Sequence, residues 1–334
     1  MGKIIPAFIP HAGCPHQCVF CNQKTISGQQ TNGIEAAKAQ IEKYGKWVKP
    51  SINNEIAFYG GSFTALPLAF QEALLQLGNA YLNKGWAGSI RLSTRPDYIN
   101  EQEMELLKKY RVRLVELGAQ SLDDKVLVLA ERGHTAAAVA SAVQLLRKFN
   151  FKVGLQFMLG LPGQDEASFK DTVAKGLALK PDIVRLYPLL VIKDTPLATS
   201  FTEGKYTPLT LDEAVRECYY AYEAFTKAGI TVIRMGLQPD TELMKIGNIL
   251  AGPFHPSFGE LVKSYGYKLK VEKIIAQLPP GDYTIVITVP PKLTSIVRGM
   301  HKSNVKAWEA SGKIKIALQE GPTFKVTSYD RKTV

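Results

Sequence analysis

Three cysteines near the start of the chain are the residues with the clearest potential for chemistry. Cys14, Cys18 and Cys21 follow the pattern C-x3-C-x2-C, so a single loop could bring three thiolates to one metal centre. Iron–sulfur clusters are usually held by four thiolates, and three would leave one iron of a [4Fe–4S] cluster with an open coordination position. Catalytic metal sites keep such a position open, whereas structural sites are closed. The spacing therefore predicts a [4Fe–4S] cluster that can bind a ligand.

The same cysteines allow two simpler interpretations, a structural zinc site or unconnected buried thiols. Zinc normally takes four ligands, and the fourth cysteine, Cys218, lies almost two hundred residues further along the chain. It falls on the apolar stripe of a predicted helix with Ala214, Tyr222 and Phe225, so we expect a small core residue there. His16 could complete a zinc site, but it lies between the cysteines, whereas zinc knuckles use two separated ligand pairs. The cluster is the favoured prediction.

The cysteine pattern resembles the signature of the radical S-adenosylmethionine (radical SAM) superfamily, in which an aromatic residue precedes the last cysteine. Phe20 stands at that position and is expected beside the cofactors. The resemblance implies that SAM binds the open iron and is cleaved reductively to a 5′-deoxyadenosyl radical. It also implies an electron donor such as flavodoxin or ferredoxin. The cofactors would supply the difficult chemistry, while the protein orients them and excludes water.

The elements that must position these groups alternate between apolar runs and amphipathic stretches. The predicted strands are residues 4–9, 56–59, 90–93, 114–117, 153–159 and 183–191. The predicted helices between them are residues 34–48, 66–82, 101–110, 123–131, 136–149 and 166–178. Repeated strand–helix units predict a parallel sheet with right-handed crossovers, and ligand sites then lie at the carboxyl ends of the strands. The expected fold is α/β, a partial (β/α)6 TIM-like barrel.

The strand–helix rhythm changes after Gly236, which indicates a second domain. A helix over 211–227 and a strand over 231–235 can still extend the sheet. A break at residues 279–282 then precedes three shorter strands. These are expected at residues 283–289, 313–318 and 324–327, after a helix over 260–277. We therefore predict a radical SAM barrel over residues 1–240 and a small basic α+β domain over residues 241–334.

Radical SAM enzymes contact their cofactors at the ends of successive strands, and the chain resembles the family at each of these ends. By that resemblance Gly60, Gly61 and Ser62 hold the methionine amino group of SAM, and paired glycines let a ligand approach the backbone closely. Ser93 stands where oxygen-independent coproporphyrinogen oxidases carry a glutamate that holds the ribose. Gln156 stands where those enzymes carry an aspartate on the ribose.

The fourth strand leads into a pattern, residues 116–123, that is shared with these oxidases and with the catalytic subunit of Elongator. By that resemblance Gln120 contacts SAM. Twelve residues later, Arg132 matches the arginine that pairs with the methionine carboxylate, a task for which a two-pronged guanidinium is well suited. The alternative for Arg132 is a solvated charge at a helix end.

The sixth strand and the residues after it resemble Elongator's catalytic subunit more than the porphyrin enzyme. Tyr187 and Lys193 would point into the mouth of the barrel, over SAM and substrate, as candidate catalytic residues. Either residue could equally be structural. The resemblance covers residues 4–240. Nothing after Leu237 offers the length or the glycine-rich loop of an acetyltransferase domain, so acetyl-dependent chemistry is not carried over. Shorter bacterial proteins with an Elongator-like barrel are the better match.

The net charge of the chain indicates which kind of partner it could bind. The net charge is +11, and residues 251–334 hold thirteen Lys or Arg against six Asp or Glu. A basic balance is expected of a nucleic-acid binder, although many cytoplasmic enzymes are basic for no such reason. The loop 298–304, with Arg298, Gly299 and Lys302, could present cations and backbone N–H groups to phosphate, or could simply be a capped helix start.

The sequence also bears on location and on the class of function. No apolar run approaches the roughly 20 residues of a membrane span, and clustered cysteines favour a reducing cytoplasm over a disulfide framework. The leading prediction is a radical SAM enzyme that modifies RNA, with a tRNA base as the expected target, and that docks RNA on a basic C-terminal surface. The alternatives are a radical SAM enzyme acting on a small metabolite or tetrapyrrole, and a non-catalytic cluster or RNA-binding protein.

Overall fold

The structure is a computed structural model that describes residues 2–14, 16–28, 33–239 and 241–331. Pro15, inside the cysteine run, lies outside the described residues. The chain divides into two compact units, which are described separately. The first comprises residues 1–214 and 221–256, and the second comprises residues 215–220 and 257–334. The domain boundary expected near residue 240 stays a prediction.

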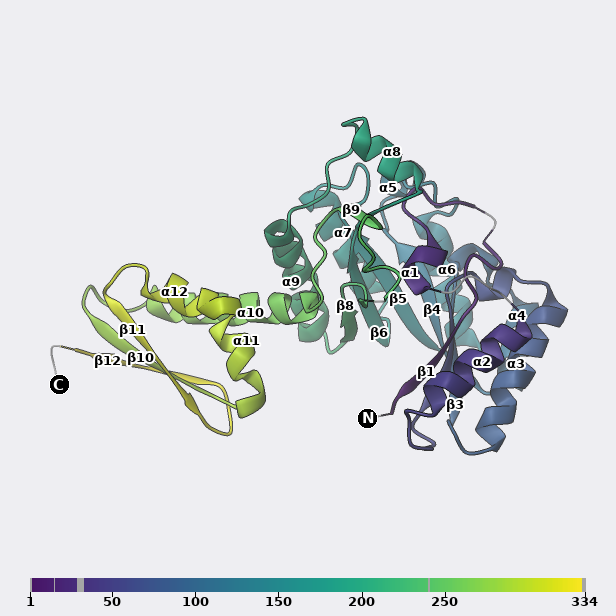
Figure 1. The fold of residues 1–334 in the computed structure, drawn as a ribbon, viewed down its shortest axis with the longest axis horizontal. Coiled ribbons are helices and arrows are strands. Elements are labelled where there is room, and N and C mark those ends of the chain that lie inside the picture. The colour runs from purple at the N-terminus through teal and green to yellow at the C-terminus, as the bar shows by residue number, and fades with distance from the viewer. Residues whose placement is uncertain (1, 15, 29–32, 240, 332–334) are drawn as a thin grey trace. The chain divides into compact units, whose positions relative to one another are not determined.

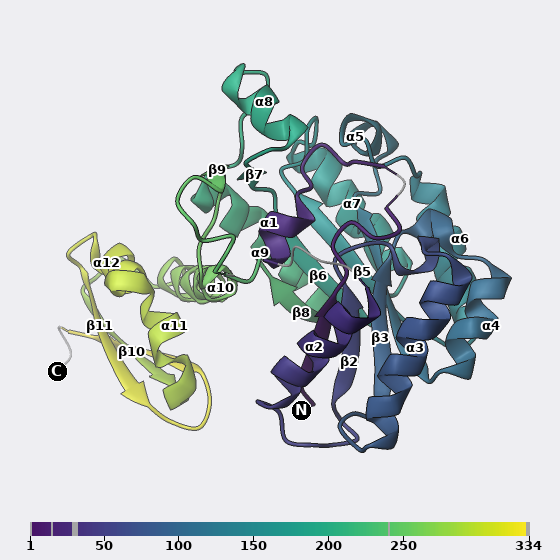
Figure 2. The same cartoon turned by 45° about the vertical axis from the view of Figure 1, so that its right-hand side comes forward.

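A curled, parallel seven-stranded sheet forms the centre of the first unit (Figures 1 and 2). In spatial order its strands are β1 (Ile4–Phe8), β2 (Glu55–Tyr59), β3 (Ser89–Thr94), β4 (Val112–Gln120), β5 (Lys152–Leu159), β6 (Ile183–Pro188) and β8 (Thr231–Met235). Strands neighbouring in space follow one another in sequence except for the step from β6 to β8. The α/β partial barrel predicted from the sequence is confirmed, and β8 extends it by a seventh strand.

Helices connect the strands and cover the outer side of the sheet, as α3, α4 and α6 do in Figure 2. The helices are α1 (Gln23–Ser27), α2 (Ile34–Gly45), α3 (Leu68–Asn83), α4 (Glu101–Lys109), α5 (Asp124–Leu129), α6 (Ala136–Lys148), α7 (Glu166–Ala178), α8 (Pro196–Thr202) and α9 (Leu211–Lys227). The single turns η1 (Phe63–Ala65) and η2 (Pro96–Tyr98) follow β2 and β3. This order places the carboxyl ends of all seven strands at one edge.

Short polar residues begin the long connecting helices. The side chains of Asn100, Thr135, Asp165 and Thr210 each accept a hydrogen bond from the backbone N–H three residues later. Thr210 and Glu213 also form a reciprocal capping box at the start of α9. Such caps satisfy amide groups that no helical carbonyl can reach, so the starts of these helices are encoded locally.

Aromatic residues hold the helices of the first unit against the sheet. Phe157 on β5 and Phe225 on α9 are fully buried, and their rings stack with centroids 5.9 Å apart. Gly176 allows α7 to approach this pair, because a Cβ there would lie 2.8 Å from Cζ of Phe157. One ring on the central strand therefore contacts both covering helices.

Two strands of the seven-stranded sheet differ most from the sequence predictions. Strand β4 runs from Val112 to Gln120, longer than the expected 114–117. The sixth strand ends at Pro188, short of the expected residue 191. Residues 191–192 instead form β7 (Val191–Ile192), which pairs antiparallel with β9 (Ile249–Ala251) in a separate small sheet. The apolar run continues through both strands, so hydrophobicity alone gave no sign of the break.

The second unit is an α+β structure around a three-stranded sheet. Strand β10 (Tyr283–Val289) lies between β11 (Ile314–Glu320), to which it is parallel, and β12 (Lys325–Asp330), to which it is antiparallel. Its helices are α10 (Phe258–Ile275), α11 (Thr294–Arg298) and α12 (Ser303–Glu309), with the single turns η3 (Pro291–Leu293) and η4 (Met300–Lys302). Inward-facing residues of β10, such as Ile285 and Ile287, pack with Trp308 in a separate core.

In the part of the chain that the structure describes, no helix combines the length and the apolar character needed to cross a membrane.

We expect Phe157→Ala to lower the free energy of unfolding by about 3–5 kcal/mol, because it removes a fully buried ring from between two helices. Guanidinium denaturation of the purified protein measures this loss. Val128→Ala is the control, since the Val128 side chain on α5 is 75% exposed and its removal should change stability by less than about 0.5 kcal/mol. Equal losses in the two variants would contradict this account of the core.

Candidate active site

The loop that carries the cysteines lies directly against the turn after β2. The Ser62 N–H donates to the Ala12 carbonyl at 2.9 Å. Gly61 and Gly13 make this approach possible, since a Cβ on Gly61 would lie 2.2 Å from the Ala12 oxygen and a Cβ on Gly13 would lie 2.2 Å from the Ser62 oxygen. Gly60 has φ +96°, a conformation that favours glycine. The glycine pair thus joins two backbones at the edge where ligands are expected.

Arg132 connects the cysteine loop to the end of β4. Its Nη1 donates to Sγ of Cys18 at 3.0 Å, and its Nη2 donates to the Gly118 carbonyl at 2.6 Å. Both Cys18 and Arg132 are buried. The next residue, Gly133, has φ +71°, and a Cβ there would lie 2.5 Å from Nε2 of His16 in the cysteine loop. Arg132 is therefore a buried guanidinium beside a thiol, not a solvated helix end.

The end of β3 supplies a second set of contacts to the same region. Thr94 Oγ1 lies 3.1 Å from Oγ of Ser62. The following residue, Arg95, forms a two-pronged ion pair with Asp97 at 2.9 and 2.8 Å and also donates to the Arg132 carbonyl. The ends of β2, β3 and β4 are thus tied to one another around the cysteine loop.

The cysteine loop is surrounded by apolar side chains from several elements. Cys18, Val19 and Phe20 are buried in this cluster, and Cys21 and Tyr187 pack against it. The other buried members are Val126, Ala130, Met158, Leu161, Leu189, Val191, Leu197 and Ala198. The apolar surrounding buries Cys18, whereas Cys21 is partly buried and Cys14 is exposed.

Burial also affects the thiols themselves. Burial, together with the neighbouring Cys18 and Cys14, raises the pKa of Cys21 to about 12. The three thiols therefore lie close enough to interact electrically, and metal binding has to displace their protons. Among the described residues, no group of three His, Cys, Asp or Glu side chains is arranged to hold a single metal ion. In a [4Fe–4S] cluster the cysteines bind separate irons.

Gln120, the last residue of β4, lies beside Gln156 in the interior of β5. Gln156 Nε2 is 3.4 Å from Oε1 of Gln120, and Gln120 has the left-handed value φ +65°. Left-handed backbone is uncommon for a residue other than glycine and occurs often at ligand sites. A Cβ on Gly118 would lie 3.1 Å from Nε2 of Gln120. Ser93 on β3 is in register with Glu116 on β4. It directly precedes Thr94, which contacts the turn after β2.

The two candidate catalytic residues occupy different surroundings. Tyr187, on β6, accepts a hydrogen bond from Nη1 of Arg185 at 3.3 Å and packs beside the cysteine cluster. Lys193 is exposed and follows the separate strand β7. Its carbonyl accepts from Nδ2 of Asn22, the residue after the last cysteine, at 3.2 Å. The backbone of Lys193 is thus tied to the cysteine loop, whereas only Tyr187 lies on a strand of the barrel.

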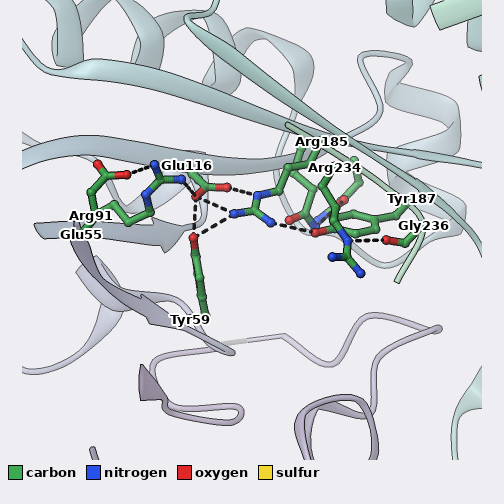
Figure 3. Close-up of polar contacts among 10 residues, drawn as sticks. Glu55, Tyr59, Arg91, Glu116, Arg185, Tyr187, Arg234 and Gly236 are labelled. Atoms are coloured by element: carbon green, nitrogen blue, oxygen red, sulfur yellow. Dashed lines mark hydrogen bonds and ion pairs between the residues drawn. The ribbon is translucent and has the colours of Figure 1, made fainter. Parts of the chain in front are cut away.

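A buried ionic network crosses the sheet below these residues, as Figure 3 shows. Glu116 on β4 accepts from Arg91 at 3.2 Å, from Arg185 at 3.1 Å and from the Tyr59 hydroxyl at 2.9 Å. Arg185 donates to the Tyr59 hydroxyl as well, at 2.8 Å, and Arg91 also pairs with Glu55. One carboxylate therefore connects strands β2, β3, β4 and β6.

The network is arranged to keep each group in one protonation state. Burial, followed by the charge of Glu116, raises the pKa of Tyr59, so its hydroxyl remains a donor. Burial opposes the charge on Arg185, but Tyr187, Tyr59 and Glu116 outweigh it and raise the pKa of that guanidinium. Gly154 on β5 leaves room for the carboxylate, since a Cβ there would lie 3.0 Å from Cγ of Glu116.

Thr94, Arg95 and Glu116 are residues of this region for which the sequence pattern alone suggested no role. A usable signal was present for the ionic network. Arg91, Glu116 and Arg185 each interrupt an otherwise apolar strand at a position that can face the inside of a barrel. Since a charge in a buried strand needs a partner, three such charges on neighbouring strands indicate an internal network.

The residues fit the cofactors that the sequence implies. The cysteine loop presents three thiols, and Arg132 places a cation beside one of them. Its Nε–H is buried without a hydrogen-bond partner among the described residues, which leaves a donor for an anionic group such as the carboxylate of SAM.

We expect Glu116→Ala to destabilise the protein by about 3–5 kcal/mol, because two buried guanidinium groups lose their shared carboxylate. Urea denaturation of the purified protein measures the change. Glu101→Ala removes an ion pair with Lys148 in which both side chains are 66% exposed, and it should leave the stability close to that of the parent protein. A Glu116→Ala variant as stable as the Glu101→Ala control would show that the network contributes nothing to the fold.

Two family models match the chain between residues 8 and 268. The radical SAM superfamily domain matches residues 8–175, and the radical SAM C-terminal domain matches residues 181–268. The tRNA uridine(34) acetyltransferase of Methanocaldococcus jannaschii is 30% identical over 256 residues, which cover 64% of this chain and 47% of that protein. Elongator complex protein 3 of Schizosaccharomyces pombe is 25% identical over 252 residues, 60% of this chain and 45% of that protein. The chain thus spans about half the length of these relatives.

A solved structure has the same fold. The archaeal Elp3 of Methanocaldococcus infernus, with an N-terminal deletion, has a TM-score of 0.64 at 24% identity, covering 81% of this chain and 63% of that one. The superfamily match extends over half of the chain and includes the cysteine loop, the glycine pair and Arg132. The chain therefore belongs to the radical SAM superfamily of enzymes.

Proposed function

We propose that this enzyme binds a [4Fe–4S] cluster through Cys14, Cys18 and Cys21, cleaves SAM reductively and modifies a nucleoside of tRNA. The observation that carries the cofactor part is the position of Arg132. Its guanidinium donates to Cys18 at 3.0 Å and to Gly118 at 2.6 Å. A single buried cation thus lies between the cluster ligands and the strand end at which SAM is expected.

The chain's own residues would bind and orient SAM. The free Nε–H of Arg132 would donate to the methionine carboxylate, and the backbone of Gly60 and Gly61 would receive the methionine amino group. Gln120 and Gln156, 3.4 Å apart, offer amide donors and acceptors to the ribose and adenine. The apolar residues around Phe20 would exclude water from this site.

When bound, the reduced cluster would supply one electron to SAM, whose C5′–S bond breaks to give methionine and a 5′-deoxyadenosyl radical. Tyr187 lies beside the cysteine loop, and its hydroxyl oxygen is held by Arg185 at 3.3 Å. We assign Tyr187 to the wall that faces the substrate. Lys193, exposed on the loop that Asn22 fixes, could approach the same substrate from outside the barrel.

The choice of tRNA as substrate is supported by the relatives and by charge. The similar proteins include tRNA uridine(34) acetyltransferases from archaea and from Dehalococcoides mccartyi. Residues 251–334, which include most of the second unit, hold more Lys and Arg than Asp and Glu. A basic surface of this kind binds RNA favourably because binding releases counterions from the phosphates. Acetyl transfer itself is not proposed, since the chain matches about half of those proteins.

The first test is SAM cleavage. Anaerobically reconstituted protein should bind about four irons per chain and should release 5′-deoxyadenosine and methionine when SAM and dithionite are added. Replacing Cys14, Cys18 or Cys21 by Ala should abolish both iron binding and cleavage. Cys218→Ala is the control and should retain both, because Cys218 is a fully buried residue of α9. Zinc bound in place of iron under these conditions would refute the cluster assignment.

Arg132→Ala should leave the iron content unchanged and should weaken SAM binding at least about tenfold, since a charge-assisted hydrogen bond contributes roughly 1.5–3 kcal/mol. Equilibrium binding of SAM to cluster-loaded protein measures this. Arg132→Lys should recover only part of the loss, because an ammonium group keeps the charge but cannot contact Cys18, Gly118 and SAM at once as the guanidinium would. Parent-like affinity in Arg132→Ala would show that Arg132 does not contact SAM.

The substrate is tested by mass spectrometry of nucleosides from the tRNA and rRNA of a deletion strain. We expect one modified nucleoside to disappear and to return when the parent gene, but not the Cys18→Ala variant, is restored. An unchanged nucleoside profile together with normal SAM cleavage would point to a small-molecule substrate instead.

A further inference from the structure

A cavity of about 440 Å³ opens within the second unit, apart from the cysteine loop and the ionic network. It lies between the first turn of α10, the residues of α11 and the loop that leads to α12. Its walls come from residues 257–264 and 295–302. Small-molecule sites usually have volumes of this order, about 300–1,000 Å³, so the cavity is large enough to receive one nucleotide.

The loop that borders the cavity is cationic. Arg298, His301 and Lys302 are exposed and line it. Glu260 is the one carboxylate among the lining residues. Within the described part of the chain, no ion pair joins Arg298 or Lys302 to a carboxylate. Because neither cation is neutralised by the protein, both are available to an anionic ligand.

The loop is held in its shape by a buried side chain. Asn304, which is 4% exposed, donates to the Ser264 carbonyl at 3.1 Å, to Oγ of Ser264 at 2.9 Å and to the Val297 carbonyl at 3.0 Å. His301 and Lys302 take left-handed conformations, with φ of 51° and 62°. Such conformations are unfavourable for side-chain-bearing residues. The fixed Asn304 therefore holds His301 and Lys302 in a conformation that they would not adopt alone.

The remaining walls suit the other parts of a nucleotide. Ser264 and Ser295 bring hydroxyl groups, which can donate to phosphate or ribose oxygens. Met300, 42% exposed, and Ile296 bring apolar surface. A polarizable thioether packs well against flat aromatic rings, and a nucleobase is such a ring.

We infer that this cavity binds one nucleotide of an RNA strand, with Arg298 and Lys302 on its phosphate and Met300 against its base. This inference rests on the proposed function, since it supplies the RNA-docking site of an enzyme that modifies tRNA. An RNA strand is favoured over a free nucleotide because the cations are exposed, so that a chain can enter and leave. The surrounding unit adds attraction for a polyanion, with thirteen Lys or Arg against six Asp or Glu over residues 251–334.

The test is fluorescence anisotropy of the full-length protein with a labelled, unmodified tRNA transcript at several salt concentrations. Arg298→Gln combined with Lys302→Gln should weaken binding at least tenfold. It should also make the slope of log K against log salt shallower by about 1.4–1.8, since each phosphate contact contributes roughly 0.7–0.9. SAM cleavage in the absence of RNA should proceed at the parent rate in this double variant.

The matched control is Lys315→Gln combined with Lys325→Gln. It removes the same charge from exposed positions on β11 and β12, outside the cavity, and should weaken binding less than threefold. Equal losses in the two double variants would overturn the cavity assignment while leaving RNA as substrate intact. A parent protein that binds no tRNA would overturn the inference and would also count against the proposed function.

Competition by adenosine 5′-monophosphate distinguishes a site for RNA from a site for a free nucleotide. At millimolar concentration it should compete weakly with tRNA for the parent protein and should not compete for the Arg298→Gln, Lys302→Gln variant. Saturable binding of this nucleotide more tightly than tRNA would identify a free-nucleotide site and would overturn the RNA assignment.

Discussion

The contact between a buried guanidinium and a thiol is the interaction on which the site depends. Arg132 reaches Cys18 and Gly118 at once, so the cysteine loop and the end of β4 cannot move independently. Arg95 in turn donates to the Arg132 carbonyl and brings β3 into the same arrangement. The three thiols themselves would hold the iron, and the contact with Arg132 sets where the guanidinium lies relative to them.

The barrel is incomplete, and its interior is held together by charge as well as by packing. In a closed barrel, layers of apolar side chains fill the centre. Here Glu116 joins Tyr59, Arg91 and Arg185 across four strands. These directional hydrogen bonds join β2, β3, β4 and β6 inside the curled sheet.

Much of the fold could be predicted from the sequence because its elements are encoded locally. The helices α7 and α9 and the strands β8 and β10 have the predicted bounds, since caps such as Asp165 and Thr210 mark where helices begin. The division between β6 and β7 could not be predicted, because it depends on pairing with β9, some sixty residues away. In the site, the cysteines and glycines were recognisable by spacing, whereas the partners of Thr94 and Glu116 are set by tertiary contacts that no local pattern contains.

The approach of the cysteine loop to the turn after β2 has a consequence for how this enzyme can diverge. Gly13 and Gly61 each face a carbonyl oxygen of the opposite segment at a distance that excludes any side chain. A clash with main chain cannot be relieved by a smaller neighbour, so no compensating substitution is available at either position. Both positions therefore tolerate glycine alone, whatever side chains occupy the rest of the two segments.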